Sequence, residues 1–176
     1  SAEEAGVPDA AIRPRLLSVL DLGYWSYSTL VGDVIAAFEP QTTDPESLEL
    51  AWVAPAAVTE RRLHLGFAAS WRHLEATLSV RPAIIVDAAN VVGSVPDGWW
   101  RDRAGAAARL LRRLGALSAA GIPASALGLT EHTWFPEWVA VIEGDARRAA
   151  DALGVQTVRA PASGDDAIVA EAVRLV

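Results

Sequence analysis

The stretch AIIVD at residues 83–87 decides the fold of the second half of the chain. It is a run of apolar, partly β-branched residues that ends in one aspartate. Such a run is typical of a strand buried on both faces of a parallel sheet. Two further apolar segments, residues 138–142 and 155–158, follow along the chain. The sequence therefore predicts three strands of one sheet.

Helical patterns lie between and after these strands. One runs over residues 101–120 and is closed by Gly121, a second covers 146–153 before Gly154, and a third covers 165–176. The inner side of the third helix is expected to carry Ile168, Val169, Ala172 and Val173. Because strands and helices alternate, the sequence predicts a parallel α/β layer with right-handed crossovers.

The residues before position 80 follow a different pattern. Residues 16–23 and 24–31 are rich in β-branched and aromatic side chains and predict two strands, and residues 50–53 predict a third. Residues 66–78 predict an amphipathic helix, because the larger apolar side chains fall on one face. We predict a first domain over residues 1–78, a linker at 79–82 and a second domain over 83–176.

The composition narrows the class of protein. The chain has 176 residues, and it contains neither cysteine nor methionine. The absence of cysteine excludes disulfides and thiolate metal sites and favours a cytoplasmic protein. No apolar run approaches the roughly 20 residues that span a bilayer, so no membrane partner is expected. The net charge of −7 disfavours nucleic-acid binding by the whole surface but permits a local basic face.

Acidic residues follow all three predicted strands of the second domain: Asp87, Glu143, and the pair Asp165 and Asp166. Ligands bind beyond the carboxyl ends of strands in open parallel sheets, so these carboxylates are expected to converge on one edge. Mg²⁺ or Mn²⁺ suits such a set, and three scattered histidines offer little for zinc. Each acid is alternatively a helix N-cap or a solvated loop residue.

Polar and aromatic neighbours of this edge are candidates for substrate binding. Asn90 suits a partner for a ligand or phosphate, or alternatively an Asx turn. Arg101 and Arg103 are expected to contact phosphate, with a solvated helical face as the alternative. The tryptophans at positions 99 and 100 suit either base stacking or anchoring in the core.

Three segments give the second domain a resemblance to the NYN branch of the PIN-like nucleases: VDAANVVG at 86–93, DGWWRDR at 97–103 and SGDDAIV at 163–169. The likeness covers residues 82–176 and implies a Rossmann-like α/β domain. It implies a metal-dependent ribonuclease acting on RNA, in which carboxylates hold Mg²⁺ that activates water. The metal ligands would be Asp87, Glu143, Asp165 and Asp166, with Asn90 beside them. The family pattern continues into a further strand, so truncation at this end is expected.

The first domain resembles the later part of a Nudix hydrolase. The segment EEAGV at 3–7 matches the end of the Nudix box, and DLGYWSY at 21–27, ESLELAWV at 46–53 and LHLGFAASW at 63–71 are similar to later parts of that fold. The resemblance covers residues 1–78 and implies a partial Nudix α/β/α fold acting on a nucleoside diphosphate linked to another group. Glu3 and Glu4 would hold Mg²⁺, with Glu46 or Glu49 as a further ligand or base. The earlier part of the box would precede Ser1, so truncation is expected here too.

Together these features predict a Mg²⁺-dependent (or Mn²⁺-dependent) hydrolase of phosphoanhydride or phosphodiester bonds, which has little activity as an isolated fragment. The predicted catalytic residues are Asp87, Asp165, Asp166 and Glu4, and the predicted substrate-binding residues are Asn90, Arg101 and Arg103. The alternative is a non-catalytic module that binds RNA or a protein and whose acidic residues are structural.

Overall fold

The computed structural model describes residues 6–8, 11–43 and 49–176. The chain divides into two compact units, residues 1–80 with 128–134, and residues 81–127 with 135–176. Gly128–Trp134 belongs with the first unit, although it lies far from residues 1–80 in the sequence. The predicted domain limits themselves stay a prediction.

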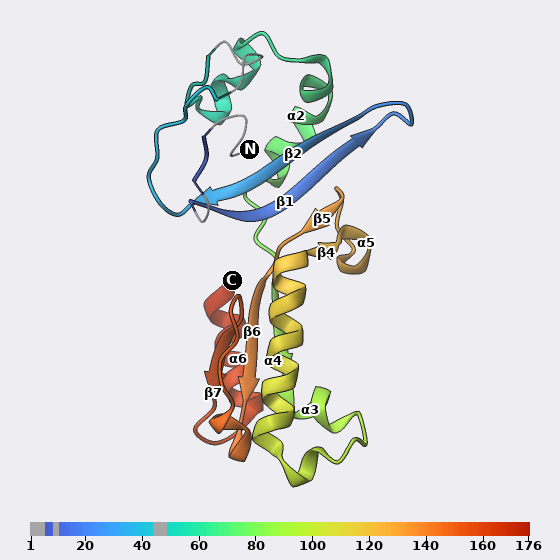
Figure 1. The fold of residues 1–176 in the computed structure, drawn as a ribbon, viewed down its shortest axis with the longest axis vertical. Coiled ribbons are helices and arrows are strands. Elements are labelled where there is room, and N and C mark those ends of the chain that lie inside the picture. Colours follow the sequence, from blue (N-terminus) through green and yellow to red (C-terminus); the bar gives the residue numbers. More distant parts are fainter. Residues whose placement is uncertain (1–5, 9–10, 44–48) are drawn as a thin grey trace. The chain divides into compact units, whose positions relative to one another are not determined.

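The first unit is built on an antiparallel hairpin of β1 (Ile12–Asp21) and β2 (Ser26–Val34). In the turn between them, the side chain of Asp21 accepts a hydrogen bond of 2.7 Å from the backbone N–H of Gly23. A short strand, β5 (Thr133–Trp134), pairs antiparallel with the other side of β1. A 3-10 helix, η1 (Pro55–Glu60), precedes helix α2 (Leu65–Thr77), which contacts both strands of the hairpin (Figure 1).

A β-bulge in β1 places a charged side chain inside the first unit. The pairing with β2 shifts between Pro14 and Leu16, so Arg15 is the extra residue, and Arg15 and Leu16 are both buried. The Nη2 atom of Arg15 donates to the backbone oxygens of Leu78 and Val80, at 2.8 and 3.0 Å. These two bonds fasten the end of α2 to the hairpin.

The second unit contains a parallel sheet with strand order β3-β6-β7. Its strands are β3 (Ala83–Asp87), β6 (Glu137–Ile142) and β7 (Gln156–Arg159). The helical segments are α3 (Ala88–Gly93), η2 (Trp99–Arg101), α4 (Arg103–Ala120), α5 (Ala124–Leu127), η3 (Gly144–Arg148) and α6 (Gly164–Leu175), and β4 (Ile122–Pro123) follows α4. Figure 1 shows α4 running beside β6, and α6 contacts β3 and β6.

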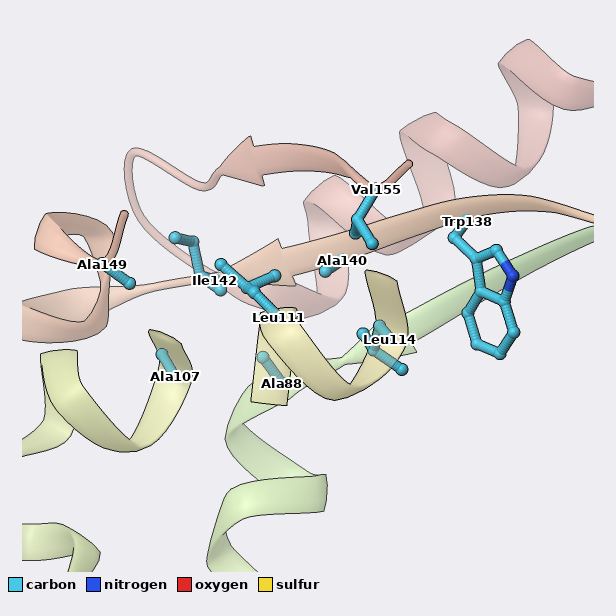
Figure 2. Packing of buried hydrophobic residues seen from close by; sticks show 9 residues of the cluster. All are labelled: Ala88, Ala107, Leu111, Leu114, Trp138, Ala140, Ile142, Ala149 and Val155. Atoms are coloured by element: carbon cyan, nitrogen blue, oxygen red, sulfur yellow. The ribbon is translucent and has the colours of Figure 1, made fainter. Parts of the chain in front are cut away.

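The core of the second unit lies between α4 and the sheet. Leu111 and Leu114 of α4 pack with Trp138, Ala140 and Ile142 of β6 (Figure 2). The intervening residues of β6, Val139 and Val141, are also buried. Burial on both faces explains why this strand is a continuous apolar run in the sequence.

Most predicted strands and helices of the two units are present. The α/β class is confirmed, with an antiparallel sheet in the first unit and a parallel sheet in the second. Helix α4 ends as predicted before Gly121, whose φ of 75° favours glycine. No helix in the described part of the chain is both long and apolar enough to cross a membrane.

Three local predictions are wrong. Residues 50–53 are not a strand; Trp52 instead packs edge-on against Phe38, with ring centroids 5.4 Å apart. The helix predicted over 146–153 is only the short η3, because the guanidinium of Arg159 donates to the backbone oxygens of Arg147 and Ala149, both at 3.0 Å, and Ala149 is extended. Three of the four residues expected on the inner side of α6 are exposed: Val169 at 63%, Val173 at 75%, and Ala172.

Candidate functional site

Asp87 ends β3 and caps α3. Its Oδ1 accepts a hydrogen bond of 3.0 Å from the backbone N–H of Asn90, and its Oδ2 accepts one of 2.7 Å from Nδ2 of Asn90. Asn90 and Asp87 are therefore brought together, but as partners of each other. Asp87 thus caps the start of a helix through Oδ1, which is the structural alternative to metal binding predicted for it.

Glu143 follows β6 and reaches the start of α6. Its Oε2 accepts a hydrogen bond of 2.6 Å from the backbone N–H of Gly164. A Cβ atom at position 164 would lie 2.9 Å from this oxygen, so glycine permits the close approach. Asp87 is in register with Val141 of the neighbouring strand, so Asp87 and Glu143 come from adjacent strand ends at one edge.

Asp165 and Asp166 lie in the first turn of α6 and are exposed. Negative side chains at this end of a helix interact favourably with its dipole, so this position alone accounts for both residues. Across residues 6–8, 11–43 and 49–176, no group of three or more histidine, aspartate or glutamate side chains is arranged to hold a metal ion. The four predicted carboxylate ligands are thus not gathered into one group.

A Mg²⁺ ion requires near-octahedral coordination by oxygen atoms, and the described carboxylates are not gathered into a cluster of three that could supply several of them. Asp87 uses both carboxylate oxygens for Asn90, and Glu143 uses one for Gly164. The other predicted metal ligands, Glu3 and Glu4, lie outside the described residues, as does Glu46. Glu49 is described and exposed.

The predicted phosphate-binding arginines lie near the start of α4. Arg101 ends η2 and is exposed. Asp102 caps α4, its Oδ1 accepting a hydrogen bond of 2.8 Å from the backbone N–H of Gly105. The guanidinium of Arg103 lies over the ring of Trp99, 5.3 Å from its centroid, within the range of a cation–π interaction. This contact orients Arg103 before any ligand is present.

A pocket of about 250 Å³ opens at this part of the second unit. Its wall combines small apolar side chains with Trp99, Arg103 and Glu143; the other lining residues are Ala88, Ala89, Val92, Ala107, Ile142, Gly144 and Ala146. A mainly apolar cavity with a few polar groups is the usual form of a small-molecule site. Arg103 and Glu143 are among the predicted site residues, whereas no pattern in the sequence marks the alanines that leave the space.

Two features of the first unit were not predicted as parts of a site. The rings of Tyr27 and His64 stack with centroids 5.3 Å apart, and Trp25 lies 5.6 Å from His64. The buried hydroxyl of Ser18 donates a hydrogen bond of 2.6 Å to Glu131, a non-glycine residue with a φ of 76°. The 113-residue separation of Ser18 and Glu131 explains why no local pattern predicts the pair.

Comparison with curated proteins gives a partial match. Over 90 residues the chain is 39% identical to a protein named "Putative 8-oxo-dGTP diphosphatase 3" in two strains of Mycobacterium tuberculosis, CDC 1551 / Oshkosh and ATCC 25618 / H37Rv. The match covers 47% of this chain and 40% of each relative, so the chain spans less than half the length of these proteins. No protein-family model matches the chain, and no solved structure matches it significantly.

Proposed function

We propose that this chain contributes to a nucleotide pyrophosphohydrolase of the Nudix type, in the cytoplasm. The observation that carries this proposal is the 39% identity over 90 residues to a protein named as an 8-oxo-dGTP diphosphatase. The Nudix-like segment EEAGV and the later segments that resemble the family lie within residues 1–78. The substrate class is a nucleoside diphosphate linked to a further group.

The resemblance gives Glu3 and Glu4 the role of ligands for Mg²⁺ or Mn²⁺. A bound metal of this kind supplies an activated water and neutralises phosphate charge. Both glutamates have the carboxylate oxygens that such ions prefer.

The experiment is a hydrolysis assay on the full-length gene product. We expect release of nucleoside monophosphate and inorganic pyrophosphate from a nucleoside triphosphate panel that includes 8-oxo-dGTP. Glu4→Gln should lower kcat by about 100-fold or more, because one charged ligand is lost. Glu39→Gln, a change at an exposed glutamate, is the matched control and should leave kcat unchanged. Equal rates for Glu4→Gln and the unchanged protein would reject the proposal.

For the second unit, the resemblance to NYN/PIN-like nucleases supports a ribonuclease with Asp87, Asp165 and Asp166 as catalytic residues and RNA as substrate. Single-stranded RNA is the test substrate, with Asp87→Asn and Asp165→Asn as variants. Cleavage that both variants abolish would support this assignment.

A second candidate for this unit is a non-catalytic module that binds RNA or a protein. The observation that favours it is the use of Asp87 and Glu143 as partners of helix N-termini. In a titration with Mg²⁺ or Mn²⁺, unchanged binding by Asp87→Asn and Asp165→Asn would show that these residues hold no metal. Weaker binding by both variants would instead support the nuclease assignment.

A further inference from the structure

One side of the pocket of the second unit, its floor, is formed by apolar side chains of the core. Ala88, Ala107 and Ile142 line it and also belong to the buried core cluster, whose residues are labelled in Figure 2. Because two of these three side chains are single methyl groups, space remains between α3, α4 and the end of β6. The floor is fixed by packing of the core, so the cavity is formed before a ligand arrives.

Two opposite charges border this cavity without neutralising each other. The guanidinium of Arg103 rests on Trp99, and within the described part of the chain it makes no ion pair. The Oε2 atom of Glu143 accepts a hydrogen bond from the backbone N–H of Gly164, whereas its Oε1 has no hydrogen-bond partner among the described residues. The pocket thus offers one ordered donor group and one acceptor on separate elements, η2–α4 and the end of β6.

The size and chemistry of the pocket limit its ligand. A cavity of about 250 Å³ lies just below the range of about 300–1,000 Å³ typical of drug-sized ligands, so it suits one heteroaromatic ring system. An ionised carboxylate only accepts hydrogen bonds, and it therefore selects a ligand edge rich in N–H donors. Guanine presents two adjacent donors, N1–H and N2–H₂, whereas uracil presents a single N–H. The exposed guanidinium of Arg103 suits a phosphate at the pocket rim.

We propose that this pocket binds a guanine nucleotide without a divalent metal, with the base against Trp99 and Glu143 and the phosphate on Arg103. The apolar floor takes the face of the base, and Glu143 accepts from its Watson–Crick edge. This site is separate from the Nudix-type activity proposed above, and its failure would leave that activity untouched. It also gives Glu143 a role in the second unit that requires no metal ligand set.

The experiment is calorimetric titration of the full-length protein with guanosine 5′-monophosphate in the presence of EDTA. Arg103→Gln and Glu143→Gln should each weaken binding by about tenfold or more, since each removes a charge-assisted hydrogen bond. Ala89→Leu tests the cavity itself, because it adds volume to the pocket from an exposed position of α3 and leaves both charged side chains in place. Arg112→Gln, an exposed arginine of α4 that does not line the pocket, is the matched control and should bind normally.

Each outcome of the titration either supports or contradicts the proposed guanine site. The proposal is supported if guanosine 5′-monophosphate binds in EDTA, if Ala89→Leu and Arg103→Gln weaken this binding, and if Arg112→Gln preserves it. Uridine 5′-monophosphate should bind with lower affinity. Absence of binding in EDTA, binding that appears only when Mg²⁺ is added, equal binding by Ala89→Leu, or equal affinity for the uridine nucleotide would overturn it. Thermal unfolding of each variant verifies that weakened binding does not come from loss of the fold.

Discussion

The carboxylate of Glu143 and the backbone N–H of Gly164 are joined by a hydrogen bond of 2.6 Å between residues 21 positions apart. This bond ties the end of β6 to the first residue of α6. We expect Glu143→Ala to destabilise the second unit by about 1–2 kcal/mol, because a helix N-terminal donor loses a charged acceptor. Urea unfolding followed by circular dichroism measures the loss.

Glu143→Gln separates the hydrogen bond from the charge. The amide oxygen still accepts from Gly164, so about half of the cost of Glu143→Ala should be recovered. Asp145→Asn, at an exposed neighbour, is the control and should change stability by less than about 0.5 kcal/mol. If Glu143→Ala and Asp145→Asn were equally stable, the bond to Gly164 would contribute nothing.

A second prediction compares two arginines that share one partner. Arg15 and Arg13 each lie 3.3 Å from a carboxylate oxygen of Asp33, but their side chains are 10% and 70% exposed. Arg15→Met should cost about 2–4 kcal/mol, because it also leaves the carbonyl oxygens of Leu78 and Val80 without this donor. Arg13→Met should cost less than about 1 kcal/mol, as is typical of exposed pairs. Equal costs in denaturant unfolding would contradict this assignment.

The sequence predicts the secondary structure best where burial is local and periodic. The run at 83–87 is a strand as predicted, but it is the edge strand of its sheet and only partly buried, whereas burial on both faces is found in β6. Gly121 ends α4 because its backbone needs a positive φ. The helix predicted over 146–153 is not formed because of a tertiary contact. The side chain of Arg159 donates hydrogen bonds to two backbone carbonyl oxygens that a helix would use for its own hydrogen bonds.

The candidate site also has a part that could be predicted from a short segment and a part that depends on residues far apart in the sequence. The position of Asp87 at a strand end and its link with Asn90 follow from a short segment, and the helix N-cap alternative describes their contact. The cavity could not be predicted, because it depends on small side chains brought together from α3, α4 and η3. Likewise, Ser18 meets Glu131 only because residues 128–134 belong to the first unit.

A third prediction concerns Gly32 of β2, which lies opposite the bulge. A Cβ atom there would overlap Cγ2 of Ile12 and lie 2.9 Å from the carbonyl oxygen of Arg13. We expect Gly32→Ala to destabilise the first unit by about 1–3 kcal/mol through overpacking. Gly93→Ala is the control: its nearest neighbour, in Trp99, is 4.0 Å away, so the change in α3 should be neutral or stabilising by up to about 1 kcal/mol. Urea midpoints of both variants report the difference.

The last prediction is a pH dependence at the loop before β7. A hydrogen bond of 2.7 Å from Nη2 of Arg159 lowers the pKa of Asp151 below its ordinary value of 3.8. Because the folded-state pKa is the lower one, the stabilisation is present above the unfolded-state pKa. It is lost as the pH falls through the folded-state pKa. Asp151 is exposed, so this effect is small and is best detected at the carboxyl group itself.

NMR titration of the Asp151 carboxyl carbon provides the measurement. In the unchanged protein the midpoint should fall below 3.8, and in Arg159→Gln it should rise toward that ordinary value because the donor guanidinium is gone. Arg148→Gln is the matched control, since Arg148 pairs with Asp145 at 3.9 Å and should leave the Asp151 midpoint in place. The same midpoint in Arg159→Gln and Arg148→Gln would show that Arg159 does not set the acidity of Asp151, and its role would then be confined to the carbonyl oxygens of Arg147 and Ala149.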